Sequence, residues 1–198
     1  ERRQRLSPRA VLVLGVIEAA VSVSLCGRSS QSLISPSCFG FAQVASTFTC
    51  LDYHVVSSTK YRKATIDAAI RDELYQYLGG IIRSEKGCLR EIGGMPDHIH
   101  LLVGIPPTLA VSDAIRVYKA NSSKWVNERS DQQRRFAWQV GYAAFTVSVS
   151  QRELVQRYIQ NQQQHHRRRS FKDEFIELLE RHQIDYRPQY VFEDEHLG

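Results

Sequence analysis

The sequence predicts an α+β domain of the ferredoxin-like type, in which a split βαβ order builds an antiparallel sheet with two helices on one face. Strand-like and helix-like patterns follow one another from about residue 46 in the order strand, helix, strand, strand, helix, strand. The 198-residue chain is long enough for one domain with a substantial core. Its composition, 42% hydrophobic and 24% charged, is globular and excludes a wholly disordered or collagen-like chain.

Periodicity and residue type predict the first three strands and the first helix. The first strand is rich in β-branched and aromatic residues, and the first helix has apolar residues at steps of three and four. The third strand is strongly apolar and ends at Pro106-Pro107. In chain order, these four elements are predicted at residues 47–58, 65–81, 88–93 and 98–105.

The second helix and the fourth strand complete the predicted sheet domain. Ser112 is typical of a helix N-cap, and apolar residues continue along one helical face to Trp125. Residues 137–148 predict the fourth strand, or two short strands broken at Gly141.

Two more helices and an extended tail are predicted after the sheet. The first helix is expected over residues 150–167. The second begins after Ser170, which forms an acidic variant of the capping box with Asp173. Residues 184–192 are expected to be extended and to pack through their aromatic side chains.

Residues 1–45 are predicted to be an atypical extension that is not part of the domain, which is expected to span residues 46–198. The segment 10–26 is apolar and follows a basic start, so a signal peptide or a membrane anchor is the alternative. The run is shorter than the about 20 apolar residues that a membrane span needs. Glu18 also lies in its middle, where a charge is costly. No membrane attachment is therefore expected.

Charge and cysteine content exclude few classes of function. The formal net charge is +5, but residues 1–45 carry +3 of it, so bulk charge alone does not argue for nucleic-acid binding. The four cysteines form no Cys-x-x-Cys pair and have no histidine at zinc-finger spacing. We interpret them as free thiols of a reducing compartment: Cys26, Cys38, Cys50 and Cys88.

His98 and His100 form a His-x-His pair on the predicted third strand. Alternation along a strand places both imidazoles on one face, about 6–7 Å apart at ~3.3 Å per residue. Ile99 then points to the opposite face, which helices can cover. Two imidazoles that share a face can chelate one divalent ion. The alternative is that both are ordinary structural or surface histidines of a strand.

A polar face of the predicted helix 150–167 complements this pair. Tyr158, Asn161, Gln162 and His165 stand at i, i+3, i+4 and i+7 and share one side of the helix. The amide of Gln162 is a candidate third ligand, and mixed nitrogen and oxygen ligation suits Mg²⁺ or Mn²⁺. Tyr158, one turn away, would place its phenolic oxygen near a metal-bound phosphate. The alternative is a polar face that points to solvent.

Other hydrolase signatures do not fit. A His-triad hydrolase would have a third histidine at the next alternate position of the strand, where this chain has Leu102. The sequence contains no His-Glu-x-x-His, Walker or Gly-x-Ser-x-Gly motif. These patterns disfavour zinc proteases, P-loop nucleotidases and serine hydrolases.

Four segments together resemble one known family. They are GGMPDHIHLLVGIPP, KANSSKW, WQVGYAAFTVS and YIQNQQQHHRRRSFKDEF. From about Thr47 to Glu193, the chain resembles the single-tyrosine HUH transposases of small bacterial insertion sequences, including their REP-associated tyrosine transposase relatives. The resemblance implies an HUH endonuclease-like fold with a C-terminal helix that bears the tyrosine. Residues 1–45 have no counterpart in it.

The resemblance also implies roles for individual residues. Tyr158 maps to the nucleophile. The implied ligands of Mg²⁺ or Mn²⁺ are His98, His100 and Gln162. Two further polar residues are candidates to support this site: Asn161 and His165.

The chemistry implied by the resemblance is cleavage and rejoining of single-stranded DNA at hairpin-bearing element ends. The Tyr158 oxygen attacks a metal-polarised phosphodiester, which leaves a 5′-phosphotyrosine link and a free 3′-OH. Attack by another 3′-OH then joins new ends without ATP. The implied partners are single-stranded DNA hairpins and a second copy of the chain, with the active site formed in cis or in trans. A cytoplasmic, nucleoid-associated protein is expected.

Basic clusters are candidates for DNA contacts. They lie at residues 60–63, 134–135 and 167–169, and a lysine and a serine lie one turn apart on the second helix. Phosphate binding combined with base stacking fits single strands and hairpins, whereas the alternative is ordinary solvated surface. The residues predicted to bind DNA are Lys60, Arg62, Lys119, Ser123, Arg167 and Arg168.

Two other functions stay open. One is a non-mobile relative that binds or processes chromosomal repeat hairpins. The other is a DNA-binding module that has lost cleavage, which the intact set of tyrosine, histidines and glutamine disfavours.

Overall fold

The computed structural model describes residues 48–129, 135–187 and Val191. The helices and strands of this part all belong to one compact unit, residues 40–198. The predicted extension 1–45, its boundary near residue 46, Arg134 and part of the tail 184–192 lie outside the described residues, so these predictions are untested. No helix within the described ranges is long and apolar enough to cross a membrane.

The sheet has four strands in the order β2-β3-β1-β4, and every neighbouring pair is antiparallel. The central strands are β1 (Asp52–Ser58) and β3 (His98–Gly104). The edge strands are β2 (Cys88–Met95) and β4 (Ala143–Val147). This strand order confirms the predicted ferredoxin-like arrangement.

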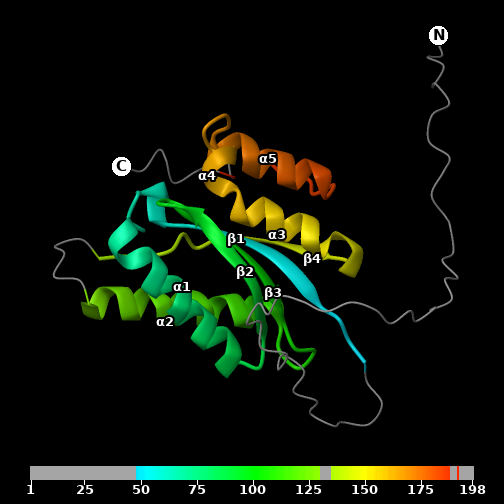
Figure 1. Ribbon diagram of the computed structural model, residues 1–198, viewed down its shortest axis with the longest axis horizontal. Coiled ribbons are helices and arrows are strands. Elements are labelled where there is room, and N and C mark those ends of the chain that lie inside the picture. The colour runs from blue at the N-terminus through cyan, green and yellow to red at the C-terminus, as the bar shows by residue number, and fades with distance from the viewer. Residues whose placement is uncertain (1–47, 130–134, 188–190, 192–198) are drawn as a thin grey trace, which may run out of the picture. The chain divides into compact units, whose positions relative to one another are not determined.

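Two helices, α1 (Ala68–Ser84) and α2 (Val111–Arg129), cover one face of the sheet, as predicted (Figure 1). The carboxylate of Asp67 accepts hydrogen bonds from the first backbone N–H groups of α1 and caps it. Helix α1 therefore begins later than the predicted Thr65. The sheet and the two helices enclose an aliphatic core whose central members are Val55, Leu74, Leu78, Ile82, Ile99, Leu101, Val103 and Ile115.

Three helices cover the opposite face of the sheet: α3 (Arg152–Gln160), α4 (Gln162–His165) and α5 (Phe171–Arg181). A smaller apolar cluster packs α5 onto β1 and β4. Its buried members are Val56, Ala143, Phe145, Leu178 and Leu179. Because side chains alternate along β3, Ile99 and Leu101 face α1 and α2, and the two histidines face the C-terminal helices.

The predicted helix 150–167 is divided at Asn161 into α3 and α4. The side-chain amide of Asn161 donates to the Arg157 carbonyl at 2.7 Å, and the backbone N–H of Asn161 donates to the same oxygen at 3.1 Å. A 3₁₀ turn, η2 (Val149–Gln151), precedes α3. The division changes the direction in which the residues of α4 point.

The fourth strand is shorter than the predicted segment 137–148. β4 begins only at Ala143, and Trp138 makes an isolated antiparallel bridge to Thr59. The second prediction for this segment, two short pieces separated near Gly141, is therefore the better description. A 3₁₀ turn, η1 (Lys60–Arg62), follows β1.

Helix α3 lies close against β2. A Cβ atom added to Gly93 would lie 2.5 Å from the Ile159 carbonyl oxygen, so only glycine permits this approach. At the start of α3, Arg152 Nε lies 2.9 Å from the buried carboxylate of Asp52, which also accepts from Arg90 at 2.6 Å. These contacts fix the helix on the sheet of its own chain.

Candidate active site

The candidate site lies between β3 and helices α3 to α5. His98 and His100 are both 0% exposed, on the sheet face that these helices cover. The Tyr158 ring, from α3, has its centroid 5.8 Å from that of His100 and 5.9 Å from that of His54. One chain therefore brings together the tyrosine and the His-x-His pair that the sequence analysis selected.

A carboxylate that the sequence analysis did not select lies at the centre of the site. Glu174, from α5, is 1% exposed. Its Oε1 accepts hydrogen bonds from the Tyr158 hydroxyl and, at 3.0 Å, from Gln162 Nε2. Its Oε2 lies 3.6 Å from His100 Nε2 and 3.8 Å from His98 Nε2. The carboxylate thus links the tyrosine to the histidines.

The sequence contained a signal for Glu174. The residue lies three positions after Phe171 and four before Leu178, within the apolar stripe predicted for the last helix. A charged residue on a buried helical face calls for a partner or a ligand. This one charged residue on an otherwise apolar helical face was the signal from which Glu174 could have been predicted.

Each histidine of the pair is oriented by a neighbour. His98 Nδ1 lies 2.7 Å from Asp97 Oδ1, and His100 Nδ1 lies 2.9 Å from His54 Nε2. Burial first, and then the neighbouring His100, lower the pKa of His54 to about 3, so its imidazole is neutral. Sequence analysis missed His54, although alternation along β1 puts it on the same face as Val56.

A buried carboxylate, Glu174, lies among the imidazoles of the site. Burial opposes the charge of Glu174, but its interactions with His100, Tyr158 and Gln162 outweigh burial and hold its pKa well below the usual range. Burial lowers the pKa of His100. Burial and then the Glu174 carboxylate raise the pKa of Tyr158, so the phenol is protonated at neutral pH. This charge balance favours a bound cation.

The residues present fit a divalent metal. Ligand atoms of His98, His100 and Glu174 lie within 4.8 Å of one another. Among the described residues, the buried polar atoms that lack a hydrogen-bond partner include both Nε2 atoms, Glu174 Oε2 and Gln162 Oε1. Leaving a buried polar atom unpaired costs about 1–3 kcal/mol, and a shared cation would remove this cost. The predicted ligand Gln162 is buried here and keeps its amide oxygen unpaired, while its Nε2 is bonded to Glu174.

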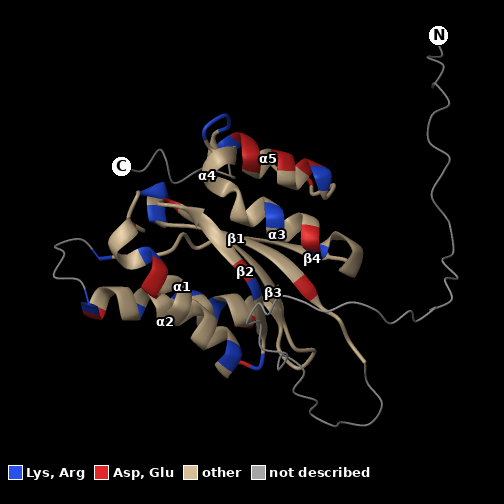
Figure 2. Cartoon of the chain, in the orientation of Figure 1, with Lys and Arg blue, Asp and Glu red and all other residues tan. Residues whose placement is uncertain are grey.

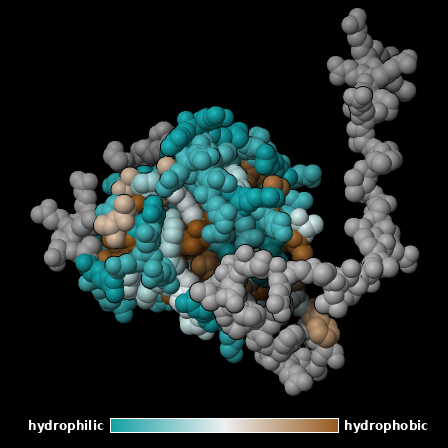
Figure 3. All heavy atoms as spheres, viewed as in Figure 1, coloured by the Kyte–Doolittle hydropathy of each residue, from teal (hydrophilic) through white to brown (hydrophobic). Residues whose placement is uncertain are grey.

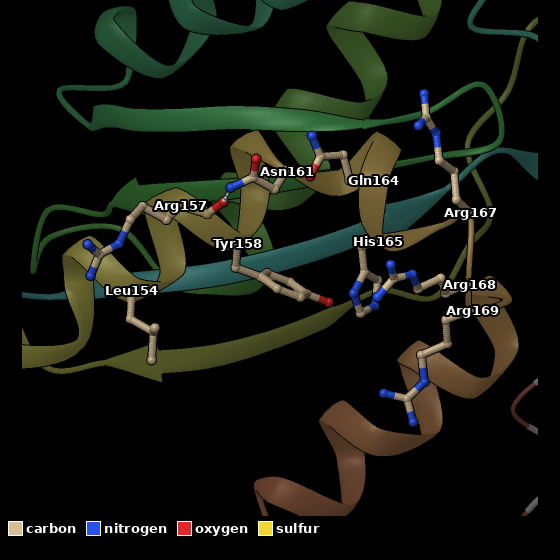
Figure 4. Close-up of a pocket in the computed structure, with 9 residues that line it drawn as sticks. All are labelled: Leu154, Arg157, Tyr158, Asn161, Gln164, His165, Arg167, Arg168 and Arg169. Atoms are coloured by element: carbon tan, nitrogen blue, oxygen red, sulfur yellow. Dashed lines mark hydrogen bonds between the residues drawn. The ribbon is translucent and has the colours of Figure 1, made fainter.

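A basic pocket leads to the tyrosine. Its volume is about 890 Å³, and four arginines, Tyr158 and His165 are among the residues that line it. Figure 4 shows the Tyr158 phenol pointing toward His165, with Arg168 beyond it. The arginines are Arg157, Arg167, Arg168 and Arg169.

One of these arginines, Arg169, pairs with the carboxylate of Glu177. In the described part of the chain, no carboxylate pairs with Arg157, Arg167 or Arg168. The loop between α4 and α5 that carries Arg167 and Arg168 is blue in Figure 2, and the surface over these helices is hydrophilic in Figure 3. The pocket is suited to an anionic backbone.

A second group of predicted DNA-binding residues lies in the η1 turn. Lys60 Nζ and Lys63 Nζ are each 5.2 Å from the centroid of the Tyr61 ring. Tyr61 and Arg62 have positive φ angles of 58° and 50°, which strain a non-glycine backbone. Thr59, which comes directly before the η1 turn, donates its N–H to the carbonyl of Asp97 at 2.8 Å. The turn is therefore attached to the segment just before His98.

Of the remaining predicted residues, Asn161 lines the basic pocket, whereas Lys119 and Ser123 do not. Lys119 and Ser123 are on α2, on the opposite face of the sheet. The Lys119 ammonium donates to the carbonyls of Gln139, Val140 and Gly141 at 2.7, 3.2 and 2.7 Å, which occupies its three hydrogens. Asn161 is exposed and bonds back to α3. For DNA binding, Lys119 and Ser123 stay predictions without support from this geometry.

The chain is similar in sequence to known transposases. Residues 47–162 match the family described as "Transposase IS200 like". The ISDra2 transposase TnpA of Deinococcus radiodurans is 28% identical over 117 residues, which are 57% of this chain and 84% of that protein. The transposase for insertion sequence element IS200 of Salmonella typhimurium is 29% identical over 115 residues, which are 56% of this chain and 75% of that protein.

A solved structure, the REP-associated tyrosine transposase bound to a REP hairpin, matches with 12% identity and a TM-score of 0.49, over 60% of this chain and 70% of that chain. The match to the IS200-like family covers more than half of the chain, including the His-x-His strand and the tyrosine helix. The chain therefore belongs to the IS200-like transposase family.

Proposed function

We propose that this transposase cleaves and rejoins single-stranded DNA at hairpin-bearing element ends through a 5′-phosphotyrosine intermediate. Tyr158 is the nucleophile, and His98, His100 and Gln162 are ligands of a divalent cation, Mg²⁺ or Mn²⁺. The observation that carries the proposal is the convergence, within one chain, of the Tyr158 phenol and the unpaired Nε2 atoms of the two histidines on Glu174.

The side chains of the site position and activate the phenol. The bound cation would act as a Lewis acid toward a non-bridging oxygen of the scissile phosphate. Tyr158 forms the new O–P bond while the P–O3′ bond breaks; its phenolic proton passes to the Glu174 carboxylate, and the leaving 3′ oxygen takes up a proton from water. In this structure Glu174 Oε1 accepts the hydrogen of the Tyr158 hydroxyl and fixes its direction. Attack by a different 3′-OH on the phosphotyrosine reverses these bond changes and joins new DNA ends.

The tyrosine helix acts in its own subunit in this proposal. Arg152 holds the start of α3 on Asp52, and Gln160 Nε2 donates to Glu91 of β2 at 2.6 Å near its end. Between these anchors, Tyr158 needs no helix from a partner to reach the histidines. The homodimer that the sequence predicts would then hold two complete sites, one in each subunit.

The arginine pocket supplies the path for the DNA backbone. Arg167 and Arg168 carry positive charge beside Tyr158 without an acidic partner in the described ranges. A phosphate that binds there would place the next phosphodiester within reach of the phenol. The exposed Tyr61 ring and its flanking lysines are a second place for a nucleotide, next to Asp97.

The decisive experiment is a covalent-adduct assay with the full chain. End-labelled single strands that carry hairpins, taken from the flanks of the gene, are incubated with the protein and Mn²⁺ or Mg²⁺ and separated under denaturing conditions. We expect a labelled protein band with the wild type, and none with Tyr158→Phe or in EDTA. Tyr77→Phe is the matched control because Tyr77 stacks on Trp125 between α1 and α2, on the opposite face of the sheet.

An adduct of equal yield with Tyr158→Phe would reject the assigned nucleophile. Hairpin binding that EDTA does not change, without any adduct, would instead identify a DNA-binding module that has lost cleavage.

A further inference from the structure

We propose that the cation site has two ligands beyond the His-x-His pair and Gln162, namely His166 and Glu174, and that its three imidazoles and one carboxylate select Mn²⁺ or a later first-row divalent ion over Mg²⁺. The inference rests on the proposed function only in placing a cation between His98 and His100. It concerns which residues of this chain hold that cation and which metal they prefer.

The distances around one carboxylate oxygen are those of a ligand set. Glu174 Oε2 lies 3.0 Å from His166 Nε2, 3.6 Å from His100 Nε2 and 3.8 Å from His98 Nε2. Two ligands bound at ~2.1 Å to one ion are roughly 3.0 Å apart at a right angle and roughly 3.5 Å apart at a tetrahedral angle. The ligand atoms of His98, His100 and Glu174 lie within 4.8 Å of one another, and His166 Nε2 adjoins this group through its 3.0 Å approach to Oε2.

The hydrogen bonds of the rings show which nitrogen is available. His166 Nδ1 lies 3.1 Å from the Arg169 carbonyl, which can only accept, so Nδ1 carries the hydrogen and Nε2 keeps its lone pair. His98 Nδ1 is held in the same way by the Asp97 carboxylate. His100 Nδ1 is held by His54 Nε2. Metal-bound histidines are oriented by this kind of contact at the other ring nitrogen.

Without a cation, this arrangement places like groups together. All three Nε2 atoms and Glu174 Oε2 are buried and lack a hydrogen-bond partner. The Nε2 lone pairs of His98 and His166 face this anionic oxygen and repel it, and burial removes the water that would separate them. The other oxygen, Oε1, is already bonded to Tyr158 and Gln162. Glu174 therefore has one oxygen for the nucleophile and one for the cation.

His165 provides an internal contrast to its neighbour. Its Nε2 is also buried without a hydrogen-bond partner, but it lies 3.6 Å from Oε1, the oxygen that is bonded to Tyr158 and Gln162. No Nδ1 hydrogen bond orients its ring within the described residues. It lines the open pocket beside Tyr158 (Figure 4). We therefore assign His166, and not His165, to the cation.

The donor set decides the metal preference. Mg²⁺ prefers oxygen ligands and keeps several waters, whereas imidazole nitrogen suits the first-row transition ions. Three imidazoles with one carboxylate offer Mg²⁺ a single charged oxygen. Mn²⁺ accepts both donor types, and affinity rises further along the first-row series to a maximum at Cu²⁺.

The first test measures Mn²⁺ binding to the full chain without DNA, from the electron-paramagnetic-resonance signal of the free ion, with Mg²⁺ as competitor. We expect the affinity for Mn²⁺ to exceed that for Mg²⁺ by about tenfold or more. Glu174→Gln and His166→Gln should each weaken Mn²⁺ binding by about 10–100-fold. The matched control His165→Gln should stay within about threefold of the wild type. Equal affinities for the two ions, or equal effects of the two histidine variants, would overturn the inference.

The second test uses the wild type and so does not depend on how a variant folds. Electron spin-echo modulation of bound Mn²⁺ reports coordinated imidazole nitrogens, and three imidazoles are expected. Two imidazoles would overturn the assignment of His166, even if the covalent adduct forms. Three imidazoles without any adduct would leave this metal site standing and reject the proposed nuclease.

Discussion

The two faces of the sheet bury different chemistry although helices cover both. Toward α1 and α2, the central strands present aliphatic side chains that are satisfied by packing alone. Toward α3, α4 and α5, the same strands present three imidazoles next to a carboxylate, and several of these polar atoms are unpaired. The first face gains stability from burial, whereas the second gives up stability to hold groups that await a ligand.

Adjacent residues of β3 belong to different faces, and this makes the comparison testable. His100 and Leu101 are neighbours in sequence and are both buried, yet one faces Glu174 and the other the aliphatic core. A substitution on the histidine face should therefore change adduct formation, whereas a substitution at the next residue, on the aliphatic face, should change the free energy of unfolding.

The largest effect is expected from this pair. His100→Gln should reduce adduct formation by about a thousandfold or more, because the loss of a metal ligand removes several kcal/mol of transition-state stabilisation. Leu101→Ala should lower the free energy of unfolding by about 2–5 kcal/mol and leave adduct formation per folded molecule nearly unchanged. Urea unfolding of the metal-free protein and the adduct assay measure the two quantities. Comparable destabilisation by both variants would contradict a division between the faces.

An intermediate effect is expected where α3 meets the sheet. Gly93→Ala should reduce adduct formation by about 10–100-fold, because the added Cβ would push α3 and Tyr158 away from the histidines. Gly80→Ala, in α1, is the control, because a Cβ at that position meets no atom within 4 Å.

The control should keep full adduct formation and gain about 0.5–1 kcal/mol of stability from the better helix former. Unchanged adduct yield with Gly93→Ala would show that the approach of α3 is not needed for the chemistry.

The smallest effect is expected at the basic pocket. Arg167→Ala and Arg168→Ala should each weaken binding of single-stranded DNA by about 3–10-fold and lower the slope of log K against log salt by ~0.7. Arg116→Ala is the control, since Arg116 is exposed on α2 and pairs with Asp113 at 3.3 Å. Binding titrations at several salt concentrations give both values. If Arg116→Ala lowers the salt slope as much as the pocket variants do, the basic pocket is not the DNA-binding site.

Much of the fold was open to prediction from local patterns. The β-branched and aromatic residues of β1, the apolar run of β3 and the three- and four-residue steps in α1 predicted the element order, and the sheet confirmed it. The break at Asn161 was not predicted, because it is a local change of backbone conformation, at φ −96° and ψ 15°, and not a change in the periodicity of the sequence. Thr65 was expected to open α1, but Asp67 is the residue whose side chain caps it.

The sequence by itself determined that His98 and His100 share one strand face, because spacing along a regular element sets which side chains point together. Tyr158 and Gln162 lie on separate helices, α3 and α4, and both donate to Glu174 Oε1. Only the tertiary structure decided that Glu174, His166 and His54 join them. These residues come from elements far apart in the chain, and periodicity does not state which faces will meet. Packing of Leu178 and Leu179 of α5 against the sheet places the carboxylate of the same helix over the imidazoles.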